Sequence, residues 1–270
     1  MEKNIFKFAL ALLVFLLAFI VFTPYFTTDF LDLRQKEEER ERKEQEIAAE
    51  KKIYLTGKFD PAQREDFVLI PQEYTIVPNK IYLRKETLEA FLWMLATAEK
   101  DGIDLKIASA TRNFDYQKDI WEKKWTGFTF VDGQDLSESL PDELERFQKI
   151  LEYSSVPGTS RHHWGTDIDI NNANLEYFKT EEGEKVYAWL TKNTPLFGFC
   201  QTYNLKGNIR PTGYNEEKWH WSFLPLSRAF TQEYKKIITE EDIKGFLGDE
   251  NVSALNLINN YVLAINPECL

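Results

Sequence analysis

The pattern of apolar and polar residues divides the 270-residue chain into an apolar N-terminal segment, a charged segment and a mixed body. Residues 8–22 are apolar on every face of a helix, and two lysines lie close before them. As a helix, residues 4–26 would cross the roughly 30 Å hydrocarbon core of a bilayer if Lys7 reached the interface. We therefore predict a membrane or signal helix over residues 1–26. We favour an anchor, because no small-residue cleavage pattern follows the run.

The charged segment is predicted as a helical stalk over residues 27–52. It contains the run LRQKEEERERKEQEIAAEKK, in which opposite charges recur at i,i+3 and i,i+4 spacing. The run has no apolar heptad seam, so we expect a solvated helix without a partner helix. The lysines before the apolar run and the acids after it predict a body outside the cytoplasm, with residues 1–26 in the cytoplasmic membrane.

The body, residues 53–225, alternates between helical and strand-like patterns. Helical spacing of apolar residues occurs at 85–102, 115–125, 141–152 and 181–193, and strand patterns occur at 103–110, 166–170, 197–203 and 219–223. Asn113 is a predicted N-cap for the second helix. Because the order lacks a strand–helix–strand rhythm, we predict an α+β fold with a small, mainly antiparallel sheet and flanking helices. Residues 226–270 are predicted as a C-terminal helical extension.

Composition narrows the class of partner. Apolar residues make up 43% of the chain, which is typical of a folded protein. The net charge of −11 argues against a nucleic-acid partner, because phosphate neutralisation requires clustered Lys and Arg. An anionic substrate stays possible, since a single arginine in a cleft can dominate the local field. The two cysteines are too few for a disulfide framework or a four-cysteine zinc site, and their pairing is open.

The three histidines of the chain carry the candidate chemistry. His162 and His163 are adjacent in SRHHWGTDIDI, and His220 lies in EEKWHWSF. Zinc accepts imidazole nitrogen and carboxylate oxygen, and catalytic sites use three protein ligands with a fourth position left open. Strand alternation places Asp167 and Asp169 on the same face. Spacing alone therefore selects neither one acid nor one member of the histidine pair.

A metal hydrolase also needs a carboxylate base, and Glu217 is the candidate, with Glu216 as the alternative. Residues three apart on a straight strand face opposite sides. Glu217 must therefore lie in a turn or bulge that returns it toward His220.

Several stretches resemble the VanY-type D-alanyl-D-alanine carboxypeptidases, which are zinc peptidases of the bacterial cell wall. SRHHWGTDID resembles their S-x-H-x-x-G-x-A-x-D motif, and EKWH at 217–220 resembles E-x-W-H. SATRNFDYQ at 109–117 is similar to their S-G-Y-R-s-x-x-x-Q block. The resemblance covers roughly residues 53–225, with the motifs in the family's order.

The resemblance implies a hedgehog/DD-peptidase-like fold and one Zn²⁺ per chain. The implied site comprises the zinc ligands His162, Asp169 and His220, the general base Glu217, the substrate-binding and catalytic Arg112, and the substrate-contacting Gln117 and Ser160. His163 falls on an unspecified motif position. Asp167 replaces the usual alanine, and it either orients a ligand imidazole or competes for the metal.

The implied reaction is removal of the C-terminal D-alanine from peptidoglycan stem peptides by a D,D-carboxypeptidase. The enzyme would act in the bacterial cell envelope, on the outer face of the cytoplasmic membrane. The same fold supports L,D-carboxypeptidase, D,D-dipeptidase and endopeptidase activities, because the pocket walls decide among them. A catalytically inactive wall-binding module is the alternative outside the enzymes.

Overall fold

The computed structural model describes the backbone of residues 2–270 and the side chains of residues 7–8, 11–15 and 32–270. The chain forms two compact units, residues 1–50 and 51–270. Helix α1 (Glu2–Leu55) comprises nearly all of the first unit, and exposed i,i+4 ion pairs line residues 32–46. Among the described residues, no helix is both long and apolar enough to cross a membrane. Most of the predicted segment 1–26 lies outside the described side chains, and the structure gives the predicted anchor no support.

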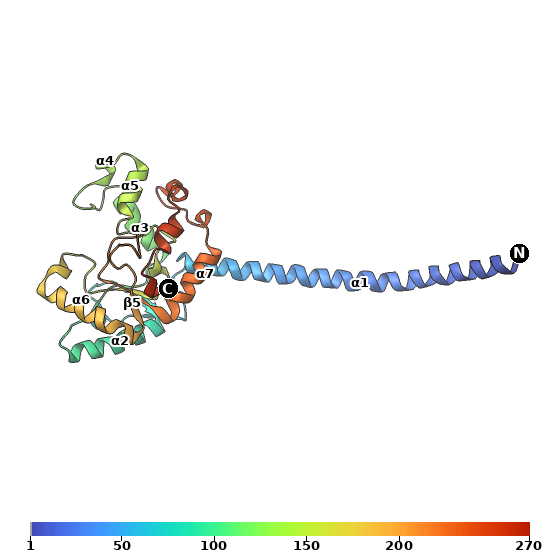
Figure 1. The fold of residues 1–270 in the computed structure, drawn as a ribbon, viewed down its shortest axis with the longest axis horizontal. Helices are drawn as coiled ribbons and strands as arrows, with labels where there is room; N and C mark the ends of the chain where they lie inside the picture. Colours follow the sequence, from blue (N-terminus) through green and yellow to red (C-terminus); the bar gives the residue numbers. More distant parts are fainter. Residues whose placement is uncertain (1) are drawn as a thin grey trace. The chain divides into compact units, whose positions relative to one another are not determined.

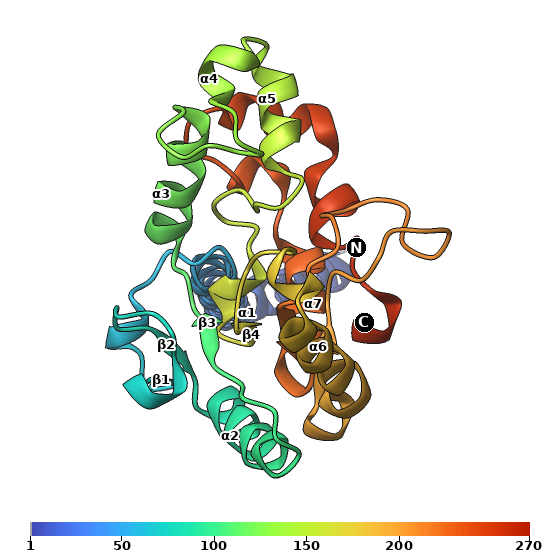
Figure 2. The same cartoon turned by 90° about the vertical axis from the view of Figure 1, so that its left-hand side faces the viewer.

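The second unit contains a four-stranded antiparallel sheet. The strand order is β3 (Ile107–Ser109), β4 (Asp167–Ile170), β6 (His220–Phe223) and β5 (Phe199–Gln201). Figure 1 labels its strand β5, and Figure 2 labels β3 and β4. A separate antiparallel pair consists of β1 (Phe67–Leu69) and β2 (Tyr82–Arg84). The predicted α+β class is confirmed. The strand predicted over 103–110 forms only at 107–109, where the chain pairs with β4.

Helices flank this sheet. They are α2 (Lys85–Lys100), α3 (Phe114–Trp125), α4 (Leu136–Ser139), α5 (Glu143–Ile150), α6 (Glu181–Asn193) and α7 (Leu224–Ile237). The predicted N-cap is confirmed, because the Asn113 side chain accepts a hydrogen bond from the Tyr116 N–H. Figure 2 shows α2 and α6 at one end of the unit and α3, α4 and α5 at the other.

Short helical turns complete the chain. Those of 3-10 type are Pro61–Gln63, Gln72–Tyr74, Arg161–Trp164, Tyr177–Lys179, Thr194–Phe197, Glu240–Asp242, Asp249–Leu255 and Pro267–Cys269, and a π-helical turn spans Ile258–Val262. The helical C-terminus predicted from 226 is therefore α-helical only as far as Ile237. Gly245 and Gly248, with φ of 98° and 86°, interrupt the remainder, because residues with positive φ cannot continue a right-handed helix.

Two apolar clusters hold the unit together. One joins the sheet to α2 and α6, with Phe91 and Ile168 fully buried. The other joins α3, α5 and α7 to the C-terminal segment, whose Phe246 and Ile265 are buried in it. A disulfide between Cys200 on β5 and Cys269 closes this segment onto the sheet. The C-terminal residues thus pack as part of the core of unit 51–270.

Candidate active site

The sheet and one tight turn bring the candidate ligands together. Antiparallel pairing places Asp169 on β4 directly opposite His220 on β6. His162 lies on the 3-10 turn immediately before β4, and this turn ends at Gly165 with φ of 71°. A Cβ at Gly165 would come within 2.4 Å of the Phe67 ring, so both the backbone conformation and the packing require glycine.

Three acceptor atoms converge at nearly equal distances. His162 Nε2 lies 3.2 Å from His220 Nδ1 and 3.3 Å from Asp169 Oδ1, and His220 Nδ1 lies 3.2 Å from the same oxygen. In a tetrahedral zinc site with bonds of about 2.0–2.1 Å, adjacent ligand atoms are about 3.3 Å apart. We call these three atoms, contributed by His162, Asp169 and His220, the ligand triangle. Their spacing is that of three corners of a zinc tetrahedron.

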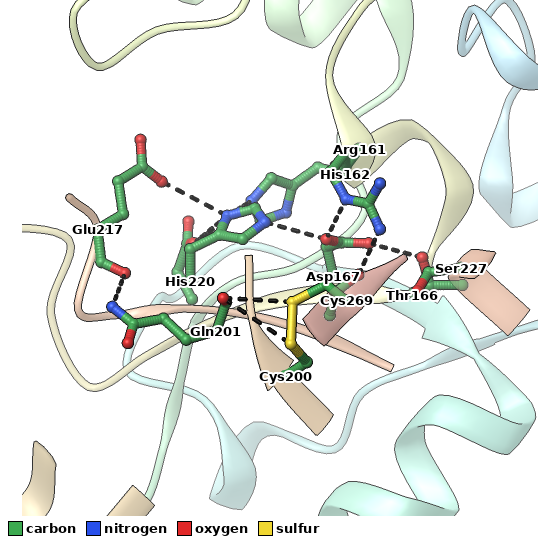
Figure 3. A network of polar contacts seen from close by, with 12 residues as sticks. Arg161, His162, Thr166, Asp167, Cys200, Gln201, Glu217, His220, Ser227 and Cys269 are labelled. Carbon is green, nitrogen blue, oxygen red and sulfur yellow. Dashed lines mark hydrogen bonds and ion pairs between the residues drawn. A yellow bond between two sulfur atoms is a disulfide. The ribbon is translucent and has the colours of Figure 1, made fainter. Parts of the chain in front are cut away.

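Hydrogen bonds on the far ring nitrogens fix the tautomers that zinc needs. His162 Nδ1 is 2.7 Å from the carbonyl oxygen of Ala110, which can only accept, so this nitrogen carries the proton. His220 Nε2 is 3.0 Å from Asp167 Oδ1 and is protonated for the same reason (Figure 3). Both remaining lone pairs then face Asp169 Oδ1, a buried oxygen with no hydrogen-bond partner in the described part of the chain. A cation satisfies all three acceptors at once.

Protonation competes with metal binding at His220. Burial lowers the pKa of His220, but the nearby carboxylates of Asp167 and Asp169 outweigh burial and raise this pKa to about 9. A proton on Nδ1 occupies the lone pair that a metal ion would use. Zinc binding to the site should therefore release a proton and weaken as the pH falls.

Asp167 contacts the ligand imidazole from behind. Its carboxylate faces Nε2 of His220, on the side away from the ligand triangle, and it accepts further hydrogen bonds from Thr166 Oγ1 at 2.6 Å and Arg161 Nε at 3.2 Å. Burial raises the pKa of Asp167, but the Arg161 guanidinium and His220 more than offset burial and hold it below its ordinary value. Of the two roles considered for Asp167, the geometry supports orientation of the imidazole.

Sequence reasoning missed Arg161. This side chain is fully buried and also donates to Ser222 and Thr231, each at 2.8 Å. The available signal was the unexpected acid Asp167, because a buried carboxylate needs a counter-charge and Arg161 precedes it by six residues.

The second histidine of the pair has a structural role. His163 Nδ1 donates to the Arg112 carbonyl oxygen at 2.6 Å, and its Nε2 accepts from the Gly158 N–H at 3.0 Å. Burial lowers the pKa of His163 to about 3, so the ring is neutral in the physiological range. His163 thereby supports the backbone of Arg112 and lies outside the ligand triangle.

Glu217 is positioned by the predicted turn. The His220 N–H donates to the Glu217 carbonyl oxygen at 3.3 Å, and this turn brings Glu217 Oε2 to 3.5 Å from His220 Nδ1. Burial raises the pKa of Glu217 to about 7, from an ordinary value of 4.5. A carboxylate with this pKa can accept and return a proton near neutral pH. Glu216 points elsewhere, toward the Tyr187 hydroxyl at 3.4 Å.

These groups share one cavity of about 560 Å³. It is lined by the ligand triangle residues, Glu217, Arg112, Ser160, Ile120, Lys124, Asp132, Tyr203, Trp219, and residues 153–155 and 173–176. Arg112 Nη2 is 3.8 Å from Asp169 Oδ2, and its Nε is buried without a partner in the described part of the chain. Gln117 lies behind the wall, where its amide donates to the Ser155 carbonyl oxygen at 2.7 Å.

Comparison with known proteins also indicates a cell-wall carboxypeptidase family. The family model VanY, described as D-alanyl-D-alanine carboxypeptidase, matches residues 80–226. Bacillus subtilis YodJ is 27% identical over 201 residues, which cover 72% of this chain and 62% of YodJ. A D-alanyl-D-alanine carboxypeptidase of Enterococcus faecalis is 27% identical over 149 residues, covering 53% of this chain and 49% of the relative. The chain thus spans about half to three fifths of these relatives.

Two solved structures are also similar. The LdcB LD-carboxypeptidase is 25% identical, with a TM-score of 0.47 over 69% of this chain and 79% of the other. A vancomycin-resistance D,D-pentapeptidase VanY in complex with Zn(II) is 23% identical, with a TM-score of 0.44 over 68% and 93%. The family match covers more than half of the chain and includes every candidate site residue. This chain therefore belongs to the VanY family of D-alanyl-D-alanine carboxypeptidases.

Proposed function

We propose that the protein is a zinc-dependent D,D-carboxypeptidase that removes the C-terminal D-alanine from peptidoglycan stem peptides. The observation that carries this proposal is the ligand triangle, which shares a cavity with Glu217 and Arg112. His162, Asp169 and His220 would hold one Zn²⁺. The ion would supply Lewis-acid chemistry, polarising the scissile carbonyl and acidifying water.

Glu217 supplies the proton transfers. Its carboxylate takes a proton from the attacking water and later returns it to the leaving amine, since its pKa of about 7 allows both forms at neutral pH. Arg112 donates to the carbonyl oxygen as negative charge develops there. A guanidinium is suited to this because it stays charged and offers several donors. Ser160 contributes a polar group to the same wall.

We also propose that the protein acts in the cell envelope, where stem peptides occur. The Cys200–Cys269 disulfide supports this location, because such bonds persist in oxidising compartments. Attachment to the cytoplasmic membrane through residues 1–26 belongs to the proposal on sequence grounds alone. Cell fractionation with detection of the full-length chain tests both points.

The deciding experiment measures metal content and cleavage together. The full chain, supplied with zinc, is incubated with a stem pentapeptide and a stem tetrapeptide, and the products are identified by mass spectrometry. We expect about one zinc per chain and release of D-alanine from the pentapeptide. Glu217→Gln should retain zinc and lose cleavage, since it removes the base without removing a ligand.

Other products would reassign the reaction. Cleavage of the tetrapeptide alone would make the protein an L,D-carboxypeptidase, and release of the terminal dipeptide would make it a D,D-dipeptidase. A wild-type chain that binds no zinc contradicts the proposed mechanism.

A further inference from the structure

A second cation, Lys124, faces the cavity. It lies in the last turn of α3, is half-buried, and lines the cavity together with Ile120, one turn earlier on the same helix. Its Nζ donates a hydrogen bond to Ser154 Oγ. No ion pair of this ammonium occurs among the described residues, and the carboxylates whose charges act on it are those of Glu217 and Asp132.

Neighbouring lysines, unlike Lys124, form ion pairs with carboxylates. Lys123, the preceding residue, pairs with Asp119 at 2.6 Å on the outer side of α3. Asp132, a carboxylate in the wall of the cavity, is 2.6 Å from Lys149. Glu217, the other carboxylate beside Lys124, is the candidate general base. It must gain and lose a proton during the reaction, so it is not a permanent partner for this ammonium. Lys124 is therefore a half-buried cation in the wall of the cavity, and its ammonium has donors in excess of the one that Ser154 takes.

The hydrogen bond to Ser154 prepares a second donor. Because the Ser154 oxygen accepts from Nζ, its own O–H is left to donate to a group in the cavity. An ammonium beside a free hydroxyl matches a carboxylate, which accepts at both oxygens. Burial lowers the pKa of Lys124, an effect that an incoming carboxylate would oppose.

We propose that Lys124 and Ser154 bind the free C-terminal carboxylate of the substrate and so restrict cleavage to the last residue of a peptide. The assignment rests on the proposed carboxypeptidase function and deepens it. In such a reaction the scissile carbonyl lies at the ligand triangle, and the terminal carboxylate lies one residue beyond. Arg112, 3.8 Å from Asp169, is placed for the carbonyl oxygen. Lys124 is the second cation in the cavity wall and is therefore the one left for the carboxylate. The Gln117 amide cannot take this role, because it lies behind the wall and donates to the Ser155 carbonyl oxygen.

The test compares two substrates that differ only at the terminus. The zinc-loaded full chain is assayed on a stem pentapeptide as the free acid and as its C-terminal amide, and kcat/KM is measured for each. The wild type should prefer the acid. Lys124→Met should lower the ratio of kcat/KM on the acid to kcat/KM on the amide by about 10- to 100-fold, because the lost interaction is with the charged terminus.

Matched variants separate this role from folding. Lys123→Met removes the adjacent, solvent-facing lysine and should change neither rate. Lys124→Arg keeps the charge and should keep most of the preference for the acid, and Ser154→Ala should reduce the preference several-fold. Zinc content, which depends on the ligand triangle, reports whether each variant is folded.

Several results would overturn the assignment. Equal losses of kcat/KM on the acid and on the amide would show that Lys124 does not bind the terminal carboxylate. An unchanged acid-to-amide ratio in Lys124→Met would show the same, and if that variant fails to fold, Ser154→Ala provides this test. A wild type that cleaves the acid and the amide equally would show that the protein does not recognise the terminal carboxylate at all. A wild type that cleaves neither overturns the proposed function itself, and the Lys124 assignment with it.

Discussion

Asp167→Asn isolates the contribution of the acid behind His220. The substitution keeps the shape of the side chain and removes its charge. Arg161, which is fully buried, then loses its only ion-pair partner among the described residues. Breaking one side of a buried pair destabilises a protein by about 3–5 kcal/mol. His220 loses the carboxylate that makes its ring a better metal ligand, and such losses weaken metal binding about 10- to 100-fold.

Two assays measure these effects separately. Urea unfolding of the metal-free full chain gives the change in unfolding free energy, and competition with a chromogenic chelator gives the zinc affinity. The double variant Arg161→Met/Asp167→Asn distinguishes the two causes. Removing both charges should recover most of the stability, because no unpaired ion remains in the core. It should leave zinc affinity low, because His220 still lacks its carboxylate. Asp119→Asn, at an exposed pair with Lys123, is the control and should change neither quantity appreciably.

The reasoning is refuted if Asp167→Asn binds zinc as tightly as the wild type. Recovery of zinc affinity in the double variant would also refute it, since Asp167 would then act only by neutralising Arg161. A stable single variant with normal unfolding would show that Arg161 finds another partner or water when Asp167 is neutral.

Three further predictions follow from the site and its support. In metal-free protein, Glu217→Gln should raise the unfolding free energy by about 3 kcal/mol at pH 8 and leave it unchanged at pH 4. The pKa of Glu217 is raised in the folded protein, so ionisation of this group destabilises the fold only at a pH above the pKa of the unfolded chain. Equal changes at both pH values in urea unfolding would contradict this. Cys200→Ser/Cys269→Ser should cost about 4 kcal/mol, since the bond closes a loop with a sequence separation of 69, and an unchanged Tm would exclude that role. Arg112→Lys should lower kcat/KM on the pentapeptide about 10- to 100-fold despite keeping the charge, and full activity would show that the planar fork is not used.

The sequence predicted those elements whose signals are local. Helical spacing located α2, α3 and α6, and Asn113 marked the start of α3 because its side chain caps the first turn. The strand β3 was predicted too long, because alternation shows which residues can pair and not which residues have a neighbour. The helical extension predicted over residues 226–270 contains α7 and several shorter helical turns. Its packing into the core could not be predicted from local patterns, because its apolar residues share a cluster with those of α3 and α5, about a hundred positions away.

Residue types alone left the ligand set open because the deciding information is long-range. Asp167 and Asp169 share a face of β4, so both remain candidates until the partner strand is known. The antiparallel register places Asp169 opposite His220 and Asp167 opposite Ser222. This arrangement directs the two acids to different nitrogens of the same ring. The resemblance to the VanY-type enzymes selected Asp169, and the geometry of the ligand triangle agrees with that choice.

The charges around the cavity explain how a protein with net charge −11 can take an anionic substrate. Behind the ligands, Arg161 cancels Asp167, and in the wall Lys149 and Lys179 pair with Asp132 and Glu176. The groups left facing the cavity are two acids, Asp169 and Glu217, and two cations, Arg112 and Lys124. These four balance, so a bound Zn²⁺ would leave an excess of two positive charges. The carboxylate of a peptide end lowers this excess to one. The total charge then stays constant during the reaction, because Glu217 becomes neutral as it takes the proton of the attacking water and the scissile carbonyl oxygen becomes negative. An amide-capped peptide leaves the excess at two positive charges, so the acid–amide comparison at Lys124 probes the charge balance of the whole site.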